Sequence, residues 1–371
     1  MLSLHNIYFQ GVKGIDELEL TLSDKQINVL IGSNGAGKTK TLEALYTLLL
    51  FTNKELSDYG LFSEDLIFDV CSISDKEIIT TINKDKNHYT RIKEFLTSNV
   101  VTHTYPVVFL AAQNRGKISR SSHNTIRPLG TVTERKSKYF EHIIDSMKNN
   151  FSSLNMDTPI EEWIIQRANS SNYYQDDEDN RELELISLLN VLNRIDNRIS
   201  NDKSSLKISG NNTVSLLIDN QKTELSALSS GFSSLIKIIQ SIIAGYAFFT
   251  NSQQIEIVEG YVLIDEIESH LHIEWQTKIL PILSEVFPNT HFIITTHSSL
   301  ILSQLYNGSA SKLIRKKNKV VNEEIPNASN FALIDLLQEA FNIDLNKIKI
   351  ESTKSEYQKN AKKAILDLLG A

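Results

Sequence analysis

A glycine-rich loop between two apolar segments constrains the fold of this chain more than any other feature. Residues 32–39 read Gly-Ser-Asn-Gly-Ala-Gly-Lys-Thr, which fits the pattern G-x-x-x-x-G-K-[ST]. The apolar run "VLI" precedes the loop, and "KTLEALYTLLLF" follows it with helical spacing. This order of strand, loop and helix predicts an α/β fold in which the loop follows a buried strand.

The loop has the composition of a phosphate-binding site. Its glycines let successive backbone N–H groups converge on phosphate oxygens, and the following helix directs its positive end at the same point. Lys38 is expected to contact the β and γ phosphates of a nucleotide, and Thr39 to offer its hydroxyl to Mg²⁺. The predicted nucleotide-binding residues are Gly32, Ser33, Asn34, Gly35, Ala36, Gly37, Lys38 and Thr39.

Two further apolar runs end in residues that such a site needs. "YVLIDE" and "HFIITTH" are continuous apolar segments, typical of buried central strands with functional side chains at their carboxyl ends. We expect Asp265 to hold the metal and Glu266 to polarise an attacking water. His297 closes the second run, where it could donate to the γ phosphate. A purely structural histidine is the alternative.

Composition excludes several other classes of protein. The 371 residues are 41% hydrophobic and 22% charged, ordinary values for a globular chain with one large domain or two modest ones. No run of about 20 uninterrupted apolar residues is present, so we expect no membrane span. The N-terminus lacks the features of a signal peptide. The single cysteine, Cys71, fits a reducing cytoplasm.

Net charge argues against a protein that coats nucleic acid, but the charge is unevenly distributed. The chain carries a formal charge of -7. The stretches 115–138 and 312–319 are nevertheless rich in lysine and arginine. They could contact DNA phosphates or form ordinary solvated surface.

The remaining segments suggest how the chain is organised. Strands are expected near the N-terminus, over 66–90 and at 107–113, and helices over about 136–200. A hairpin is expected across 210–212, a helix from about 231, and two helices in the tail from about 331. Apolar residues form a two-heptad seam, typical either of a short helical arm or of an amphipathic surface helix. The seam residues are Leu185, Leu188, Leu192, Ile195 and Ile199.

A third motif gives the chain a family resemblance. Leu228-Ser-Ser-Gly-Phe232 stands directly before a predicted helix and resembles the signature motif of ABC-type ATPases. The resemblance implies an α/β ABC-ATPase head: a central, mostly parallel P-loop sheet, an antiparallel N-terminal β subdomain and an inserted helical arm. The implied parts are an N-terminal ATPase lobe at 1–135, a helical insertion at 136–200, a C-terminal ATPase lobe at 201–325 and a helical tail at 326–371.

The signature motif also implies a shared site. In ABC-type ATPases its serine and glycine contact the nucleotide bound by another subunit. Ser229 and Gly231 would therefore complete the ATP site of a second copy, giving a homodimer or a higher even oligomer through composite ATP sites. The motif departs from the usual form at Ser230 and Phe232, which leaves slow hydrolysis open.

Two longer stretches resemble a narrower group. "HNIYFQGVKGIDELELTLSDKQINVLIGSNGAGKTKTLEAL" is similar to the opening of SMC, RecF and OLD-type ATPases. "LIDEIESHLHIEWQTKILPIL" and "FPNTHFIITTHSSLIL" are similar to OLD-like ATPases of bacterial antiphage systems, such as the Septu and retron-associated ATPases. By the same resemblance Gln113 is a candidate metal-sensing residue. Arg115 competes with it, and a strand end without a role is a third possibility.

Two smaller groups of residues have weaker assignments. Glu268, His270 and His272 follow the predicted catalytic glutamate; a loop that contacts a second subunit is favoured over a metal site. Tyr8 or Phe9 could stack on adenine, although an aromatic residue in an N-terminal strand is more often part of the core.

The resemblance supports three hypotheses for function. The first is an ATPase that acts as sensor or scaffold in an antiphage system. OLD proteins commonly carry a TOPRIM nuclease domain, but no Asp-x-Asp pair follows residue 305, so a separate effector, a nuclease or toxin, is expected. The second is a RecF-like or SMC-like repair ATPase that clamps DNA on binding ATP. The third is a slow assembly module whose main output is its shape.

Overall fold

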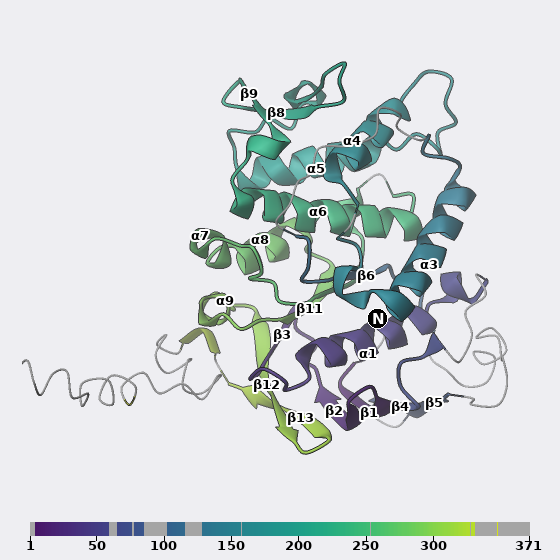
Figure 1. Cartoon of the computed structure of the whole chain (residues 1–371), viewed down its shortest axis with the longest axis vertical. Coiled ribbons are helices and arrows are strands. Elements are labelled where there is room, and N and C mark those ends of the chain that lie inside the picture. Colours follow the sequence, from purple (N-terminus) through teal and green to yellow (C-terminus); the bar gives the residue numbers. More distant parts are fainter. Residues whose placement is uncertain are drawn as a thin grey trace, which may run out of the picture.

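The computed structural model describes most of the chain (Figure 1). The described residues are 4–58, 65–75, 78–84, 102–115, 128–156, 158–252, 254–326, 328–330 and 347. The predicted tail helices and residues 116–127 of the basic stretch 115–138 lie outside them.

A ten-stranded sheet forms the centre of the molecule, with the order β5-β4-β1-β2-β13-β12-β3-β11-β10-β6. One half is parallel and consists of β12 (Gly308–Lys316), β3 (Ile27–Ile31), β11 (Thr290–Thr295), β10 (Gly260–Ile264) and β6 (Val107–Leu110). The other half is antiparallel and consists of β5 (Ile78–Asn83), β4 (Val70–Asp75), β1 (Asn6–Val12) and β2 (Ile15–Thr21). The predicted α/β fold is confirmed.

Side-chain patterns explain the two halves. Every residue of β3, β6 and β10 is buried, as expected for parallel strands covered on both faces. In β2 the buried residues Leu18 and Leu20 alternate with Glu17, Glu19 and Thr21, which are exposed or half-buried, so one face of this part of the strand is solvated.

A hairpin joins the two halves of the sheet. β13 (Lys319–Ile325) pairs antiparallel with β12 and parallel with β2. The basic stretch 312–319 spans the end of β12 and the start of β13. It is therefore part of the central sheet, a placement that its charge did not suggest.

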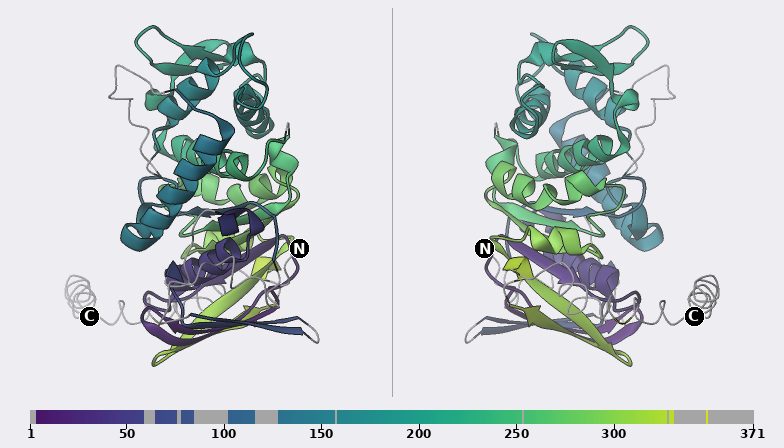
Figure 2. Two further views of the ribbon diagram at one scale, coloured as in Figure 1. Left: turned by 90° about the vertical axis from the view of Figure 1, so that its right-hand side faces the viewer. Right: turned by 90° about the vertical axis from the view of Figure 1, so that its left-hand side faces the viewer.

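Helices cover the sheet and build a second layer beyond it (Figures 1 and 2). They are α1 (Lys38–Phe51), α3 (Val132–Asn149), α4 (Ile160–Asn169), α5 (Glu182–Ile195), α6 (Ser230–Phe249), α7 (Ile273–Gln276), α8 (Ile279–Val286) and α9 (Ser299–Ser303). Short 3₁₀ turns are η1 (Lys54–Asp58), η3 (Phe151–Ser153), η4 (Lys203–Ser205), η5 (Leu225–Ala227), η6 (Ile255–Ile257) and η7 (Ala328–Asn330).

α6 is the helix on which the helical layer rests. It packs against β6, α3 and α5, and a Cβ added at Gly245 would lie 2.4 Å from Cγ2 of Val108. Glycine at this position therefore lets the helix approach the strand closely. α6 is long and apolar enough to cross a membrane, but 83% of that apolar window is buried inside the protein. It is thus a core helix.

The predicted insertion forms a compact layer. α4 and α5 are joined by a buried cluster in which Glu184 accepts hydrogen bonds from Nε of Arg167 (2.9 Å) and Nε of Arg181 (2.7 Å). Above them lies a three-stranded sheet of β7 (Leu206–Ile208), β8 (Val214–Ile218) and β9 (Gln221–Glu224), which contains the expected hairpin.

One prediction within the insertion is wrong. The apolar seam was expected to run through Ile199, but α5 ends at Ile195. Ile199 instead forms an isolated antiparallel bridge with Ile218, because Asp196 turns the chain toward β8. The four domain ranges given above remain predictions.

Candidate nucleotide site

The glycine-rich loop connects β3 to α1, as the sequence predicts. Gly37 is the N-cap of α1 with φ of 100°, a conformation that glycine adopts without strain. A Cβ at this position would also lie 2.8 Å from Cδ1 of Ile15. β2 therefore lies against the loop and leaves no space for a side chain there.

Lys38 lies inside the curve of the loop. Its Nζ donates to the carbonyl oxygens of Gly32 (2.9 Å) and Ser33 (3.1 Å), and only 7% of the residue is exposed. Burial lowers the pKa of the ammonium group, and the charges of nearby carboxylates, foremost Asp265, act in the opposite direction. The loop thus places a buried cation among backbone groups at a helix N-terminus, where anions are stabilised.

Thr39 and Asp265 meet across the site. The Thr39 hydroxyl donates to Oδ2 of Asp265 at 2.9 Å, and Thr295 on β11 donates to Oδ1 at 2.6 Å. The same Thr295 hydroxyl accepts from the backbone N–H of Glu266 at 2.8 Å. β3, β10 and β11 are neighbours in the sheet, so their carboxyl ends bring these residues together. A hydroxyl beside a carboxylate is a set of hard oxygen donors that fits Mg²⁺.

Glu266 occupies a turn with a left-handed backbone. Its φ is 46°, which is uncommon outside glycine and occurs often at functional sites. The side chain is half-buried. β10 ends at Ile264, and the turn that follows sets the direction of the Glu266 carboxylate beside the loop lysine.

Arg115 holds the backbone of this turn. It is fully buried and donates to the carbonyl oxygens of Glu266 (2.9 Å), Asp265 (3.0 Å) and Ala111 (2.8 Å). Burial lowers its pKa to about 10, so the guanidinium remains charged at neutral pH. Gln113, the competing candidate, is exposed. Of the two, Arg115 is the residue that contacts the site in this structure.

Glu268 orders the segment that carries His297. Its carboxylate accepts from the Thr296 hydroxyl and from the backbone N–H of His297, both at 2.6 Å. The sequence placed Glu268 in a subunit-contact loop and missed this role. Only the pairing of β10 with β11 brings Glu268 to Thr296. Among the described residues, no cluster of three His, Cys, Asp or Glu side chains is arranged to hold a metal.

The signature residues lie apart from the loop, at the start of α6. Ser229 is the N-cap and accepts from the N–H of Phe232 at 3.4 Å. A Cβ on Gly231 would lie 2.9 Å from Cδ1 of Trp275 and 3.2 Å from Cβ of His272. Gly231 therefore lets the segment that leads into α7 pack directly on the helix N-terminus.

The suggestion that Phe9 stacks on adenine is wrong. Phe9 is fully buried in the core, where its ring packs against Phe68 with centroids 5.1 Å apart. β1 turns alternate residues to opposite faces of the sheet, and Phe9 lies on the buried face. Tyr8, on the other face, is half-buried.

The fold and the site define a P-loop nucleotide-binding protein, and comparison with known proteins gives its family. Residues 27–303 match the family described as "AAA domain, putative AbiEii toxin, Type IV TA system", and the chain belongs to this family.

Curated relatives agree with the family assignment. The chain is 25% identical to "Retron Vc95 probable ATPase" of Vibrio cholerae, covering 81% of this chain and 71% of the relative. It is 26% identical to "Septu protein PtuA" of Bacillus thuringiensis, covering 80% and 72%. The predicted resemblance to Septu and retron-associated ATPases is confirmed.

Similar solved structures are heads of SMC proteins. The SMC head domain from Thermotoga maritima has 13% identity and a TM-score of 0.43, over 87% of this chain and 99% of that one. An SMC head bound to the C-terminal winged-helix domain of ScpA has 14% identity and a TM-score of 0.46, over 86% and 97%.

Proposed function

We propose that this protein is a Mg²⁺-dependent ATPase whose copies close in pairs around ATP and that it acts as the sensor or regulatory scaffold subunit of an antiphage system. The observation that carries the proposal is the network of Thr39, Asp265, Thr295 and Glu266. It joins the phosphate loop to the carboxylates that metal binding and water activation require.

The roles of the residues follow from their positions. The backbone of residues 32–39 and Lys38 would hold the β and γ phosphates, and Thr39 with Asp265 would hold Mg²⁺. When bound, Mg²⁺ neutralises charge that develops on the phosphates. Glu266 would orient and polarise the attacking water. His297, fixed through its backbone by Glu268, would donate to the γ phosphate.

Arg115 has a supporting role in this scheme. Among the described residues, its hydrogen bonds within the site go to backbone carbonyls, so it is a positioning residue for Asp265 and Glu266. Gln113 is retained as a candidate that would approach the metal only after the side chain moves from its exposed position.

Dimer closure is supported by the surface around the signature motif. Ser229 and Gly231 adjoin α7, where the apolar side chain of Ile273 is 63% exposed. A second copy would cover Ile273 and receive Ser229 and Gly231 at its own phosphate loop. The exposed His270 and His272 would then lie at the contact between the copies.

The biological setting rests on the relatives. One is a retron ATPase and the other a Septu protein, and both names refer to defence systems with several components. A separately encoded effector, a nuclease or a toxin, would supply the damaging activity, and ATP-driven closure would control it. The expected location is the cytoplasm.

The proposal is tested with Glu266→Gln. The amide cannot act as a base but keeps the shape of the side chain, so this variant should bind Mg-ATP and accumulate in the closed form. Light scattering should show a mass that rises with Mg-ATP to an even number of chains. Protein purified from cells that also express the neighbouring genes should show any effector as additional mass.

The matched control is Ser229→Arg in the same background. The new side chain should block closure and still allow each subunit to bind ATP. If both variants bind ATP and both remain monomeric, closure around ATP is ruled out. Hydrolysis by Glu266→Gln at the parental rate would place the base elsewhere.

An alternative function is a RecF-like or SMC-like ATPase that clamps DNA. The observation in its favour is the exposed turn of the β12–β13 hairpin, which carries Lys316 and Lys317. Other cations of the stretch have protein partners: Lys319 contacts Glu19 at 2.6 Å, and Arg315 donates to the carbonyl oxygens of Gly35 and Gly14. ATP-dependent duplex binding that weakens steeply with salt, and that is lost in Lys316→Glu/Lys317→Glu, would favour this function.

A further inference from the structure

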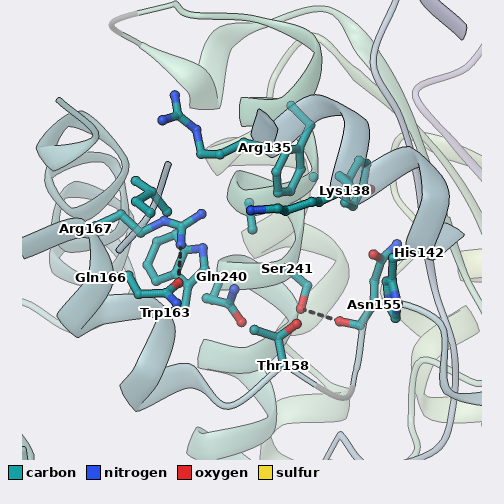
Figure 3. Close-up of a pocket in the computed structure, with 15 residues that line it drawn as sticks. Arg135, Lys138, His142, Asn155, Thr158, Trp163, Gln166, Arg167, Gln240 and Ser241 are labelled. Carbon is teal, nitrogen blue, oxygen red and sulfur yellow. Dashed lines mark hydrogen bonds between the residues drawn. The ribbon is translucent and has the colours of Figure 1, made fainter. Parts of the chain in front are cut away.

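A cavity of about 260 Å³ lies in the helical layer, between α3, α4 and α6 (Figure 3). This volume lies just below the range of about 300–1,000 Å³ that is typical of small-molecule sites, so the cavity can enclose only a compact ligand or part of a larger one. It is separate from the phosphate loop, because none of the residues that line it belongs to that loop.

Two residues that line the cavity carry buried polar groups without partners among the described residues. Oε1 of Gln240 and Nε1 of Trp163 have no hydrogen-bond partner among the described residues, and each residue is only 2% exposed. Figure 3 shows Gln240 between Trp163 and Ser241. Leaving such groups unpaired costs about 1–3 kcal/mol each. A ligand that satisfies both must present one hydrogen-bond donor and one acceptor.

The walls of the cavity are suited to a flat ring. Tyr139 and Phe248 stack with ring centroids 3.8 Å apart and an interplanar angle of 8°. In a second stacked pair, the guanidinium of Arg167 lies 4.7 Å from the centroid of the Trp163 ring. All four residues line the cavity. Planar aromatic and guanidinium groups stack favourably on heterocyclic bases.

Charge around the cavity is one-sided. The described residues that line it include Arg135, Lys138, His142 and Arg167 and no carboxylate. Arg135 is paired with Asp179, and Arg167 with Glu184. Lys138 and His142 are exposed, and Figure 3 shows the Lys138 side chain extending over the cavity. These two residues would meet an anionic group at the entrance.

We propose that this cavity binds a free mononucleotide. The base would lie among the aromatic side chains, where its edge offers a donor to Gln240 and an acceptor to Trp163, and the phosphate would meet Lys138. Gln240 and Phe248 belong to α6, the helix that begins beside Ser229. The bound nucleotide would thus contact the same helix that carries the signature motif.

The test measures binding directly, in Lys38→Ala protein so that the phosphate loop does not contribute. Calorimetric titration with AMP, GMP, CMP and UMP should show saturable binding of at least one nucleotide, with ribose 5-phosphate as the probe that lacks a base. Trp163→Phe keeps a ring but removes the N–H, and Gln240→Leu removes the amide. Each should weaken binding about tenfold, the effect of one lost hydrogen bond.

Lysine variants test the entrance. Lys138→Ala should weaken binding about tenfold, as expected for one charge-assisted hydrogen bond. Lys136→Ala is the matched control: it lies on the same helix but contacts Glu55, so affinity should be unchanged. The proposal is overturned if no mononucleotide binds, if ribose 5-phosphate binds equally well, or if Trp163→Phe and Gln240→Leu both leave the affinity unchanged. None of these outcomes depends on ATP hydrolysis, so they leave the proposed function untouched.

Discussion

The nucleotide site and the cavity in the helical layer differ in whether their polar groups have hydrogen-bond partners. At the nucleotide site the carboxylates of Asp265 and Glu268 and the hydroxyls of Thr39 and Thr295 all have partners. In the cavity the amide oxygen of Gln240 and the indole N–H of Trp163 have none among the described residues. The first arrangement is held in place by its own bonds. The second carries a free-energy cost that a ligand would remove.

The largest expected effect tests which of the two sites binds ATP. Lys38→Ala should lower the affinity for Mg-ATP by at least about 100-fold, since charge-assisted hydrogen bonds contribute about 1.5–3 kcal/mol each. Binding of labelled ATP checks this. Lys40→Ala is the control, because Lys40 lies on the same helix and contacts Glu43. Unchanged ATP affinity in Lys38→Ala would show that ATP binds elsewhere, and the helical-layer cavity would be the first place to examine.

A second experiment compares stability at the two sites. Arg115→Met should lower the free energy of unfolding by about 2 kcal/mol, because carbonyl oxygens at the Asp265 turn lose a charged donor. Gln240→Leu should leave the free energy unchanged or raise it, because an unpaired amide is replaced by an apolar group of similar size. Urea denaturation of both variants measures the difference. Equal destabilisation by Arg115→Met and Gln240→Leu would contradict the difference in hydrogen bonding between the two sites.

The third expected effect concerns pH at the far end of α1. His103 is buried; its Nε2 donates to the Leu49 carbonyl at 2.8 Å and its Nδ1 accepts from the Tyr105 N–H. Burial lowers the pKa of its imidazole to about 4. The unfolded chain binds a proton on this residue near pH 6.5, whereas the folded chain binds it only near pH 4. Stability from His103 is therefore complete above pH 6.5 and is lost as the pH falls toward 4.

His103→Gln isolates that contribution. Between pH 7.5 and pH 5 the parent should lose about 2 kcal/mol more unfolding free energy than the variant. Denaturation curves at both pH values give the comparison. An identical loss in both proteins would mean that His103 titrates normally and that the end of α1 is open to solvent.

Local sequence was sufficient for much of the nucleotide site. The phosphate loop and the ends of β10 and β11 were predicted from short patterns, and the structure places them together at the same edge of the sheet. Such patterns are reliable because a buried parallel strand must be apolar throughout, while its carboxyl end is free to carry polar residues. The basic hairpin, by contrast, was judged by its charge, which says nothing about strand pairing.

Other features depended on contacts between distant segments. Arg115 and Glu268 act on backbone groups of neighbouring strands, and no local pattern marks a side chain that bonds to a carbonyl or N–H far away in the sequence. The apolar seam ends at Ile195 rather than at Ile199, because Ile199 pairs with β8 instead of continuing the helix. The sequence by itself determined the phosphate loop, the carboxylates and the family. Only the tertiary structure determined how the Asp265–Glu266 turn is supported and where the cavity lies. Both depend on how several helices and strands pack together, whereas sequence periodicity describes one helix or strand at a time.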